Sequence, residues 1–157
     1  MIGKNLKVEE KGFTLLETLL VLIITSSLLL FPVLSIKNVT ETIQIDLFFR
    51  ELTSKITNMQ THAILHDQTT DIQFYPQNNV IKFRVVDANA QNEFLKETWE
   101  LDNPYYRLSG TSIKEFAFKK GSGNITKSDR IYIHTTKGEY ELVYLMGSGR
   151  FEIRERK

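Results

Sequence analysis

The chain lacks cysteine altogether and carries almost no net charge. Its 157 residues contain no Cys, which excludes disulfide bonds and thiolate metal sites. The formal net charge is +1 at pH 7, so only a local patch could recognise nucleic acid or an acidic partner. No long low-complexity tract and no internal repeat is visible. These absences favour a bacterial surface protein of one modest domain that relies on its own core.

Motifs of catalysis and cofactor binding are also missing. No glycine-rich loop has the spacing of a phosphate cradle, and no Ser/His/Asp set can be assembled. His62 and His66 would share a helix face, but a metal site needs further ligands. Asp67 and His134 are the obvious additions, and nothing in the sequence places His134 nearby. We therefore expect a protein that is not an enzyme and holds no metal and no cofactor.

A long apolar run near the N-terminus is the strongest positive feature. Residues 13–34 contain a single charge, Glu17. A helix of this length is about 33 Å long at 1.5 Å per residue, which is close to the thickness of a bilayer core. Lysines precede the run at positions 4, 7 and 11, whereas only Lys37 follows nearby. The sequence thus predicts a single-pass membrane helix with a cytoplasmic N-terminus and the remaining chain outside.

Two simpler interpretations of this run compete. A cleaved secretory signal would have an apolar region of about 7–15 residues followed by a small-x-small site. This run is longer, and residues 31–35 contain no such site. A plain membrane anchor with an incidental Glu17 is the other alternative. Intramembrane acids are costly, about 2.5–3.5 kcal/mol for a central Asp, and usually mark a function.

The segment Gly12-Phe13-Thr14-Leu15-Leu16-Glu17 resembles the leader junction of type IV pilins and pseudopilins. A short basic leader, Gly before the cut, Phe after it and Glu as the fifth mature residue all match. The resemblance implies that a prepilin peptidase cuts between Gly12 and Phe13 and methylates the new amino group of Phe13. The leader would be discarded, and the mature chain would comprise residues 13–157.

The physics of Glu17 agrees with that resemblance. Cleavage leaves an α-amine at the membrane face, and a buried carboxylate one helical turn away needs a partner. In a filament, the amine of one subunit can meet the carboxylate of its neighbour, and their attraction is stronger inside an apolar bundle than in water. A pair that is satisfied only in the assembly favours assembly and its register. The alternative is that Glu17 reaches the cytoplasmic headgroups.

The C-terminal end indicates which group within this family the chain resembles. Gly147-Ser148-Gly149-Arg150, followed by Phe151 and a short charged tail, resembles the end of the ComGD-type minor pseudopilins of Gram-positive competence systems. The total length also fits that family, whereas the middle of the chain matches it only in pattern. The resemblance implies a competence pilus that takes up DNA in natural transformation.

The remaining sequence predicts an α+β fold that is type IV pilin-like, with a long N-terminal helix packed on a C-terminal antiparallel β-sheet domain. We divide the chain into a leader (1–12), an assembly helix (13–35), an amphipathic helix (36–67) and a β-rich extracytoplasmic domain (68–157). Apolar residues recur at steps of three and four along the second segment: Ile36, Val39, Ile43, Leu47, Leu52, Ile56, Met59 and Ala63. Strands are expected at 71–75, 80–86, 93–101, 112–118, 130–136, 139–146 and 150–155.

The basic tail is a candidate DNA contact. On a strand, Arg150, Arg154 and Arg156 would share one face, with Lys157 following them. Such a ridge could touch the DNA backbone. Its acids, Glu152 and Glu155, dilute the charge, which favours instead an edge strand protected from aggregation. Six tyrosines and one tryptophan could stack on single-stranded DNA, but packing within the sheets is their more common use.

These observations predict a minor pseudopilin of a competence type IV pilus. The residues expected to matter are Gly12 and Phe13 for processing and Glu17 for assembly. Its partners would be the prepilin peptidase, other competence pilins and pseudopilins, and the membrane, with DNA contacted indirectly. We expect it in the cell membrane and then at the cell surface. The alternatives are a type II secretion-like pseudopilin and a membrane-anchored binding module that never polymerises.

Overall fold

A computed structural model describes residues 12–86, 96–127, 129–145 and 149–156, with side chains throughout except at 30–38 and 127. It divides into two units, residues 1–40 and residues 41–157, which are treated separately below. Helix α1 (Leu15–Leu65) takes part in both. The leader, part of the predicted third strand, residues 146–148 and Lys157 lie outside the described residues.

In the first unit, α1 begins directly after Thr14, whose side chain caps it. The backbone N–H of Glu17 donates to the carbonyl of Thr14 at 3.0 Å and lies 3.3 Å from its Oγ1, as expected of an N-cap residue. Along the helix, Thr25 donates to the carbonyl of Val21 and Ser27 to that of Ile23, each at 2.8 Å. These bonds satisfy the hydroxyl groups of Thr25 and Ser27 within the helix itself, so neither needs a partner from elsewhere.

The described residues contain no helix that is both long and apolar enough to cross a membrane. The predicted span, 13–34, includes part of the stretch 30–38, whose side chains lie outside the description.

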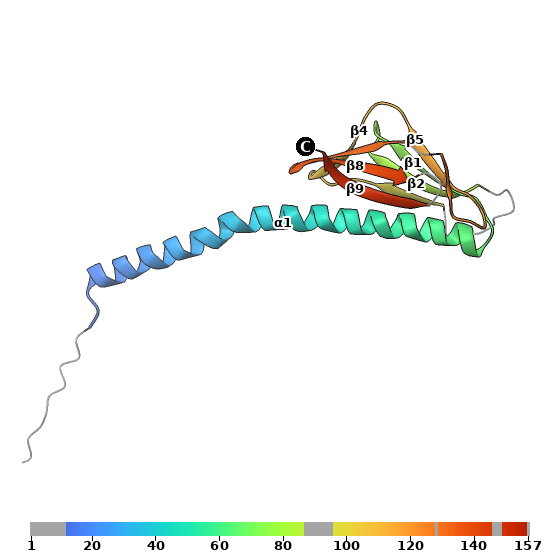
Figure 1. Ribbon diagram of the computed structural model, residues 1–157. Helices are drawn as coiled ribbons and strands as arrows, with labels where there is room; N and C mark the ends of the chain where they lie inside the picture. Colours follow the sequence, from blue (N-terminus) through green and yellow to red (C-terminus); the bar gives the residue numbers. More distant parts are fainter. Residues whose placement is uncertain (1–11, 87–95, 128, 146–148, 157) are drawn as a thin grey trace, which may run out of the picture. The chain divides into compact units, whose positions relative to one another are not determined.

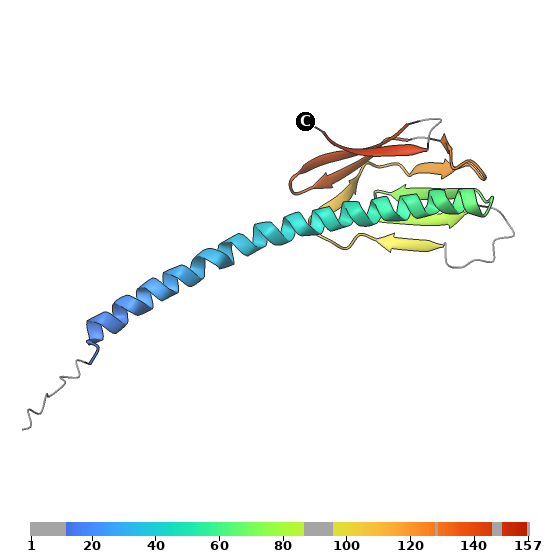
Figure 2. The same ribbon diagram turned by 60° about the horizontal axis from the view of Figure 1, so that its bottom comes forward.

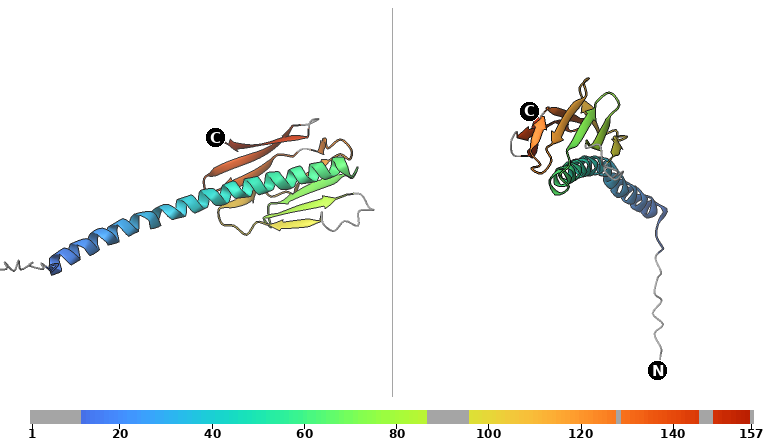
Figure 3. Two further views of the ribbon diagram at one scale, coloured as in Figure 1. Left: turned by 90° about the horizontal axis from the view of Figure 1, so that it is seen from below. Right: turned by 90° about the vertical axis from the view of Figure 1, so that its right-hand side faces the viewer.

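In the second unit, two antiparallel sheets accompany the C-terminal half of α1 (Figure 1). The first sheet has the order β3-β2-β1-β5-β6 and consists of β1 (Thr70–Tyr75), β2 (Val80–Val85), β3 (Glu97–Glu100), β5 (Lys114–Phe118) and β6 (Ile125–Lys127). The second has the order β4-β7-β8-β9 and consists of β4 (Tyr106–Ser109), β7 (Ile131–Thr135), β8 (Gly138–Leu145) and β9 (Arg150–Arg156). Both sheets lie on the same side of this half of the helix (Figures 2 and 3).

One face of the helix supplies the centre of the core. The buried helix residues recur at steps of three and four: Ile45, Phe48, Leu52, Ile56, Met59 and Ala63. They meet buried strand residues of both sheets: Ile72, Phe74, Ile81, Phe116, Phe118, Ile133 and Leu142. Each large side chain buried here contributes about 1.5–3 kcal/mol. The core of the second unit is therefore built on the helix.

The predicted apolar stripe is correct only in its C-terminal half. Leu52, Ile56, Met59 and Ala63 are buried, whereas Ile43 and Leu47 remain about half exposed. The buried stripe passes through Ile45 and Phe48 instead, because Phe48 packs on the rings of Trp99 and Tyr106 at 5.4 and 4.0 Å between centroids. The sheets thus select which of two apolar stripes is buried, and Ile43 and Leu47 stay uncovered.

Most predicted strands are present within one or two residues of the predicted bounds. The sequence failed to indicate β4 and β6, which have four and three residues. Such short strands lack a readable alternation, and their pairing with β7 and β5 defines them. The sequence suggests a two-residue hairpin connection at Lys137-Gly138, but the structure places it one residue earlier, at 136–137, because Gly138 already pairs with Thr135 as the first residue of β8.

Gln60 ties the helix to both sheets at one point. Its Nε2 donates to the carbonyl of Gly123, in the β5–β6 connection, at 3.1 Å and to that of Gly149, at the start of β9, at 3.0 Å. Gly149 is buried and has a φ of 64°. A Cβ atom there would overlap the Gln60 amide and lie 2.6 Å from the Gly123 carbonyl oxygen. The glycine of the C-terminal motif is therefore required by packing.

Substitution Gly149→Ala should destabilise the second unit by about 2–4 kcal/mol, because it combines a left-handed backbone with overpacking. Trp99 is the single tryptophan and packs on Phe48, so its fluorescence during urea unfolding of the full chain in detergent micelles measures the loss. Gly12→Ala is the control, since a Cβ atom at Gly12 meets nothing within 4 Å. Equal unfolding midpoints for the two variants would contradict this account.

Burial raises the pKa of Tyr144 well above its ordinary value, and its hydroxyl group has no hydrogen-bond partner in the part of the chain that the structure describes. The unfolded chain releases this proton near pH 10 and the folded chain does not, so stability is lost as pH rises through about 10. We expect Tyr144→Phe to be as stable as wild type or more so at pH 8. Its urea midpoint should fall less between pH 8 and about pH 10.5. An unchanged alkaline loss would rule out this explanation.

Candidate functional site

The predicted cleavage junction is open to a peptidase. Gly12 and Phe13 precede the helix and have no regular secondary structure. The side chain of Phe13 is 77% exposed, and nothing lies within 4 Å of a Cβ built at Gly12. An extended, uncovered peptide bond next to a helix start can enter a protease site without unfolding the chain.

Glu17 sits at the third helical position, counted from the Thr14 cap. Thr14 and Glu17 have the spacing of a capping box, in which an acid or amide supports the helix start. The Glu17 side chain is exposed, and the described residues place no hydrogen bond or ion pair on its carboxylate. The reciprocal bond from the Thr14 N–H to this carboxylate is thus not formed among the described residues, although the Thr-x-x-Glu spacing would allow it. The carboxylate is therefore available to a partner outside its own chain.

The helix around Glu17 presents apolar side chains on all sides. Every described residue from 12 to 29 is exposed, and the large apolar ones are 49% to 80% exposed. Val39, Ile43 and Leu47 continue an uncovered apolar row at steps of four. A monomer rarely exposes this much apolar surface in water, and such a surface marks an interaction site.

The basic tail is largely neutralised within its own sheet. On β9, Arg154 contacts Glu152 at 2.5 Å, and Arg156 lies 3.6 Å from Glu139 of β8. The guanidinium of Arg156 also lies over the ring of Tyr132, 5.3 Å from its centroid. Arg150 opens the strand opposite Leu145, and Lys157 lies outside the described residues. These pairs resemble a charged edge strand more than a free basic ridge.

Several aromatic residues that could have stacked on DNA belong to the core. Trp99 and Tyr106 pack on Phe48, Tyr140 packs on Phe49 at 4.7 Å between centroids, and Tyr144 is buried. Their faces are therefore not available to bases without unfolding.

Other titratable groups show no catalytic arrangement. The rings of His62 and His66 stack with centroids 4.3 Å apart, and His62 Nε2 lies 2.9 Å from Gln68 Oε1. No cluster of three metal-binding side chains occurs among the described residues. Asp71 is buried but is held by Arg84, whose Nε lies 3.1 Å from Asp71 Oδ1. That hydrogen bond raises the pKa of Arg84, which marks a structural ion pair.

The arrangement of α1 and the two sheets is shared with a solved structure, the minor pseudopilin EpsH from the type 2 secretion system of Vibrio cholerae. The chain has the type IV pilin-like fold of a minor pseudopilin. The two structures superpose with a TM-score of 0.54 over 70% of this chain and 95% of that one, at 12% sequence identity. No protein-family model and no curated protein matches the sequence. The predicted α+β pilin-like fold is thereby confirmed.

Because its cations are paired, the tail should contribute little to DNA binding. The triple variant Arg150→Ala, Arg154→Ala, Arg156→Ala should leave any gel shift of duplex DNA by the full-length chain unchanged at low salt. Lys119→Ala, Lys120→Ala, which removes two exposed lysines of the β5–β6 connection, is the comparison variant. A wild-type shift that disappears in the triple variant alone would establish the tail as a DNA contact.

Proposed function

We propose that the chain is a minor pseudopilin of a competence type IV pilus, which assembles at the cell surface for DNA uptake in natural transformation. The observation that carries this proposal is the unpaired carboxylate of Glu17 on an apolar helix surface that its own chain leaves uncovered. The pseudopilin-like fold and the open Gly12–Phe13 junction support it. Its role is structural: it is the substrate of a prepilin peptidase, not an enzyme.

In this proposal, cleavage after Gly12 frees the amine of Phe13, which the peptidase then methylates. The helix anchors the precursor in the cell membrane with its N-terminus in the cytoplasm. During assembly, the Phe13 amine of one subunit meets the Glu17 carboxylate of another, and both lose their net charge inside an apolar bundle. Other competence pilins and pseudopilins then cover the exposed row of Val39, Ile43 and Leu47. DNA is contacted by the assembled pilus and not by this chain's tail.

We propose a competence pilus and not a secretion system because the C-terminal end of the chain resembles the competence pseudopilins. The solved neighbour belongs to a secretion system, so a type II secretion-like pseudopilin is the second candidate. Deleting the chain in its own cells separates the two functions. We expect transformation to be lost and the proteins of the culture medium to be unchanged; the opposite pattern would favour the secretion pseudopilin.

Glu17 provides the sharpest test of assembly. We expect Glu17→Ala and Glu17→Gln both to be cut normally, because the junction precedes the helix, and to lower the amount of chain in sheared surface filaments at least tenfold. Glu41→Gln, which changes a partly buried acid of the same helix, is the matched control and should assemble normally. Intact mass identifies the mature terminus, immunoblotting of sheared filaments measures assembly, and transformation frequency measures function.

The paired variants separate two roles of Glu17. Glutamine can still form a capping box but carries no charge. If Glu17→Gln assembles normally while Glu17→Ala does not, the role of Glu17 in assembly is helix capping and not charge pairing. A mature chain that still begins at Met1 would favour the membrane-anchored module that never polymerises.

A further inference from the structure

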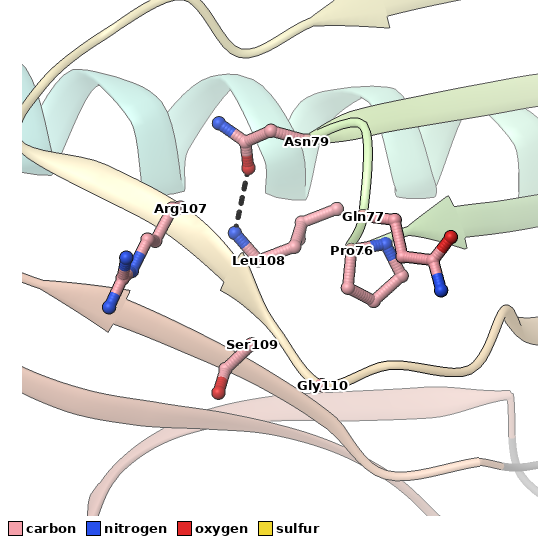
Figure 4. Close-up of a pocket in the computed structure, with 7 residues that line it drawn as sticks. All are labelled: Pro76, Gln77, Asn79, Arg107, Leu108, Ser109 and Gly110. Carbon is pink, nitrogen blue, oxygen red and sulfur yellow. Dashed lines mark hydrogen bonds between the residues drawn. The ribbon is translucent and has the colours of Figure 1, made fainter.

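Three adjoining hollows follow the chain from Pro104 to Ile113. The largest, of about 450 Å³, lies between the β1–β2 turn and β4 (Figure 4). Hollows of about 210 and 240 Å³ flank it. The first of these shares Arg107 with the central hollow, and the second shares Pro76 and Gln77 with it. The three together form a groove along β4, which we call the β4 groove.

The central hollow of the groove lies beside an edge strand. Among the strands that the structure describes, β4 is at the edge of its sheet and pairs with β7 alone. The carbonyl of Tyr105 accepts the N–H of Thr136 beyond β7 at 3.0 Å, and backbone groups alternate in direction along an antiparallel strand. The backbone of Leu108 therefore points away from β7. Its N–H donates instead to Oδ1 of Asn79 at 2.8 Å (Figure 4), so a side-chain amide takes the place of a neighbouring strand.

The groove also favours a ligand of negative charge. Arg107 is exposed and lies between two of the hollows, and Figure 4 shows it on the opposite side of the central hollow from Pro76 and Gln77. Arg130, Arg154 and Arg156 of the same sheet each have a carboxylate partner, whereas the described residues give Arg107 none. No Asp or Glu is among the residues that line the three hollows. The charge of Arg107 is therefore left for an outside group.

We propose that the β4 groove binds an extended, acidic segment of another filament subunit as an added strand on β4. Main-chain hydrogen bonds to Tyr106 and Leu108 would supply affinity, and a carboxylate facing Arg107 would supply specificity. In the unbound protein, the side chain of Asn79 occupies this edge by accepting the N–H of Leu108, and the bound segment would take its place. This proposal rests on the proposed function only in taking the partner to be a filament subunit.

A second copy of the chain fits the groove less well. Its own free edge on this sheet is β9, which carries Arg150, Arg154 and Arg156 against Glu152 and Glu155. That strand is not acidic overall and would bring arginines towards Arg107. The charge of the groove thus favours a different, acidic partner.

The binding test uses a labelled octapeptide of alternating Thr and Glu, with alternating Thr and Lys as the control peptide. Fluorescence anisotropy with the full-length chain in detergent micelles should detect the acidic peptide alone. Arg107→Glu should weaken its binding at least tenfold, and Arg107→Lys less. Lys120→Glu is the matched control, since Lys120 is an exposed cation of the β5–β6 connection that lines none of the three hollows, and should bind as wild type does.

Strand pairing is tested separately from charge by two N-methylated acidic peptides, methylated on alternate sets of residues. An added strand uses the N–H groups of one set only, so one peptide should lose binding and the other keep it. Equal effects of both peptides, equal binding of acidic and basic peptides, or equal effects of Arg107→Glu and Lys120→Glu would overturn the proposal. Concentration-dependent dimers abolished by Arg107→Glu would assign the groove to a second copy and also overturn it.

The outcomes remain separable from those of the proposed function. Peptide binding in micelles needs no filament, so its failure leaves the Glu17 results untouched. In cells, Arg107→Glu should lower filament incorporation while leaving cleavage and methylation of Phe13 normal. Peptide binding that persists while Glu17→Ala and Glu17→Gln both assemble normally would instead remove the proposed pairing of Glu17 and keep the groove.

Discussion

The second unit depends on the packing of one helix face against two sheets at once. The sheets share no strand, and the buried stripe from Phe48 to Ala63 lies in a core with side chains from both. The ring of Phe48 meets β3 and β4, while Gln60 bonds to the β5–β6 connection and to the residue that opens β9. The carbonyl of Met59 accepts the hydroxyl of Thr70 at the start of β1. The helix therefore sets the position of each sheet by contacts along its length.

The same helix leaves its N-terminal part uncovered, and this contrast supports the proposed function. From Ile45 onward one apolar face of the helix is buried within the chain, whereas the large apolar residues described up to Leu29 are all exposed. An exposed apolar surface of this size marks an interaction site. In the proposed function, the acid on that surface, Glu17, constrains which neighbours fit and at what axial position.

The long helix, the strand order along the chain and the cleavage junction could all be predicted because each has a local cause. An apolar run, a period of two and the Gly-Phe-Thr-Leu-Leu-Glu pattern are readable in short windows. The choice between Leu47 and Phe48 for burial was not readable, because it depends on Trp99 and Tyr106 from distant strands. Likewise, Asn79 was expected in a turn, but its bonds to Leu101 and Leu108 exist only in the folded sheets. The charge pairs of β9 similarly required the register of β8, which sets Arg156 opposite Glu139.

The two hydrogen bonds of Gln60 have a consequence for the order of folding. Its partners Gly123 and Gly149 lie 63 and 89 positions later in the chain, and contacts between residues so far apart in sequence slow folding. The helix therefore cannot complete this pair of bonds until residue 149 has been synthesised. Until β9 has formed, Phe151 and Ile153 lack the core against which they pack. The second unit consequently reaches its final packing only when the chain is synthesised as far as β9.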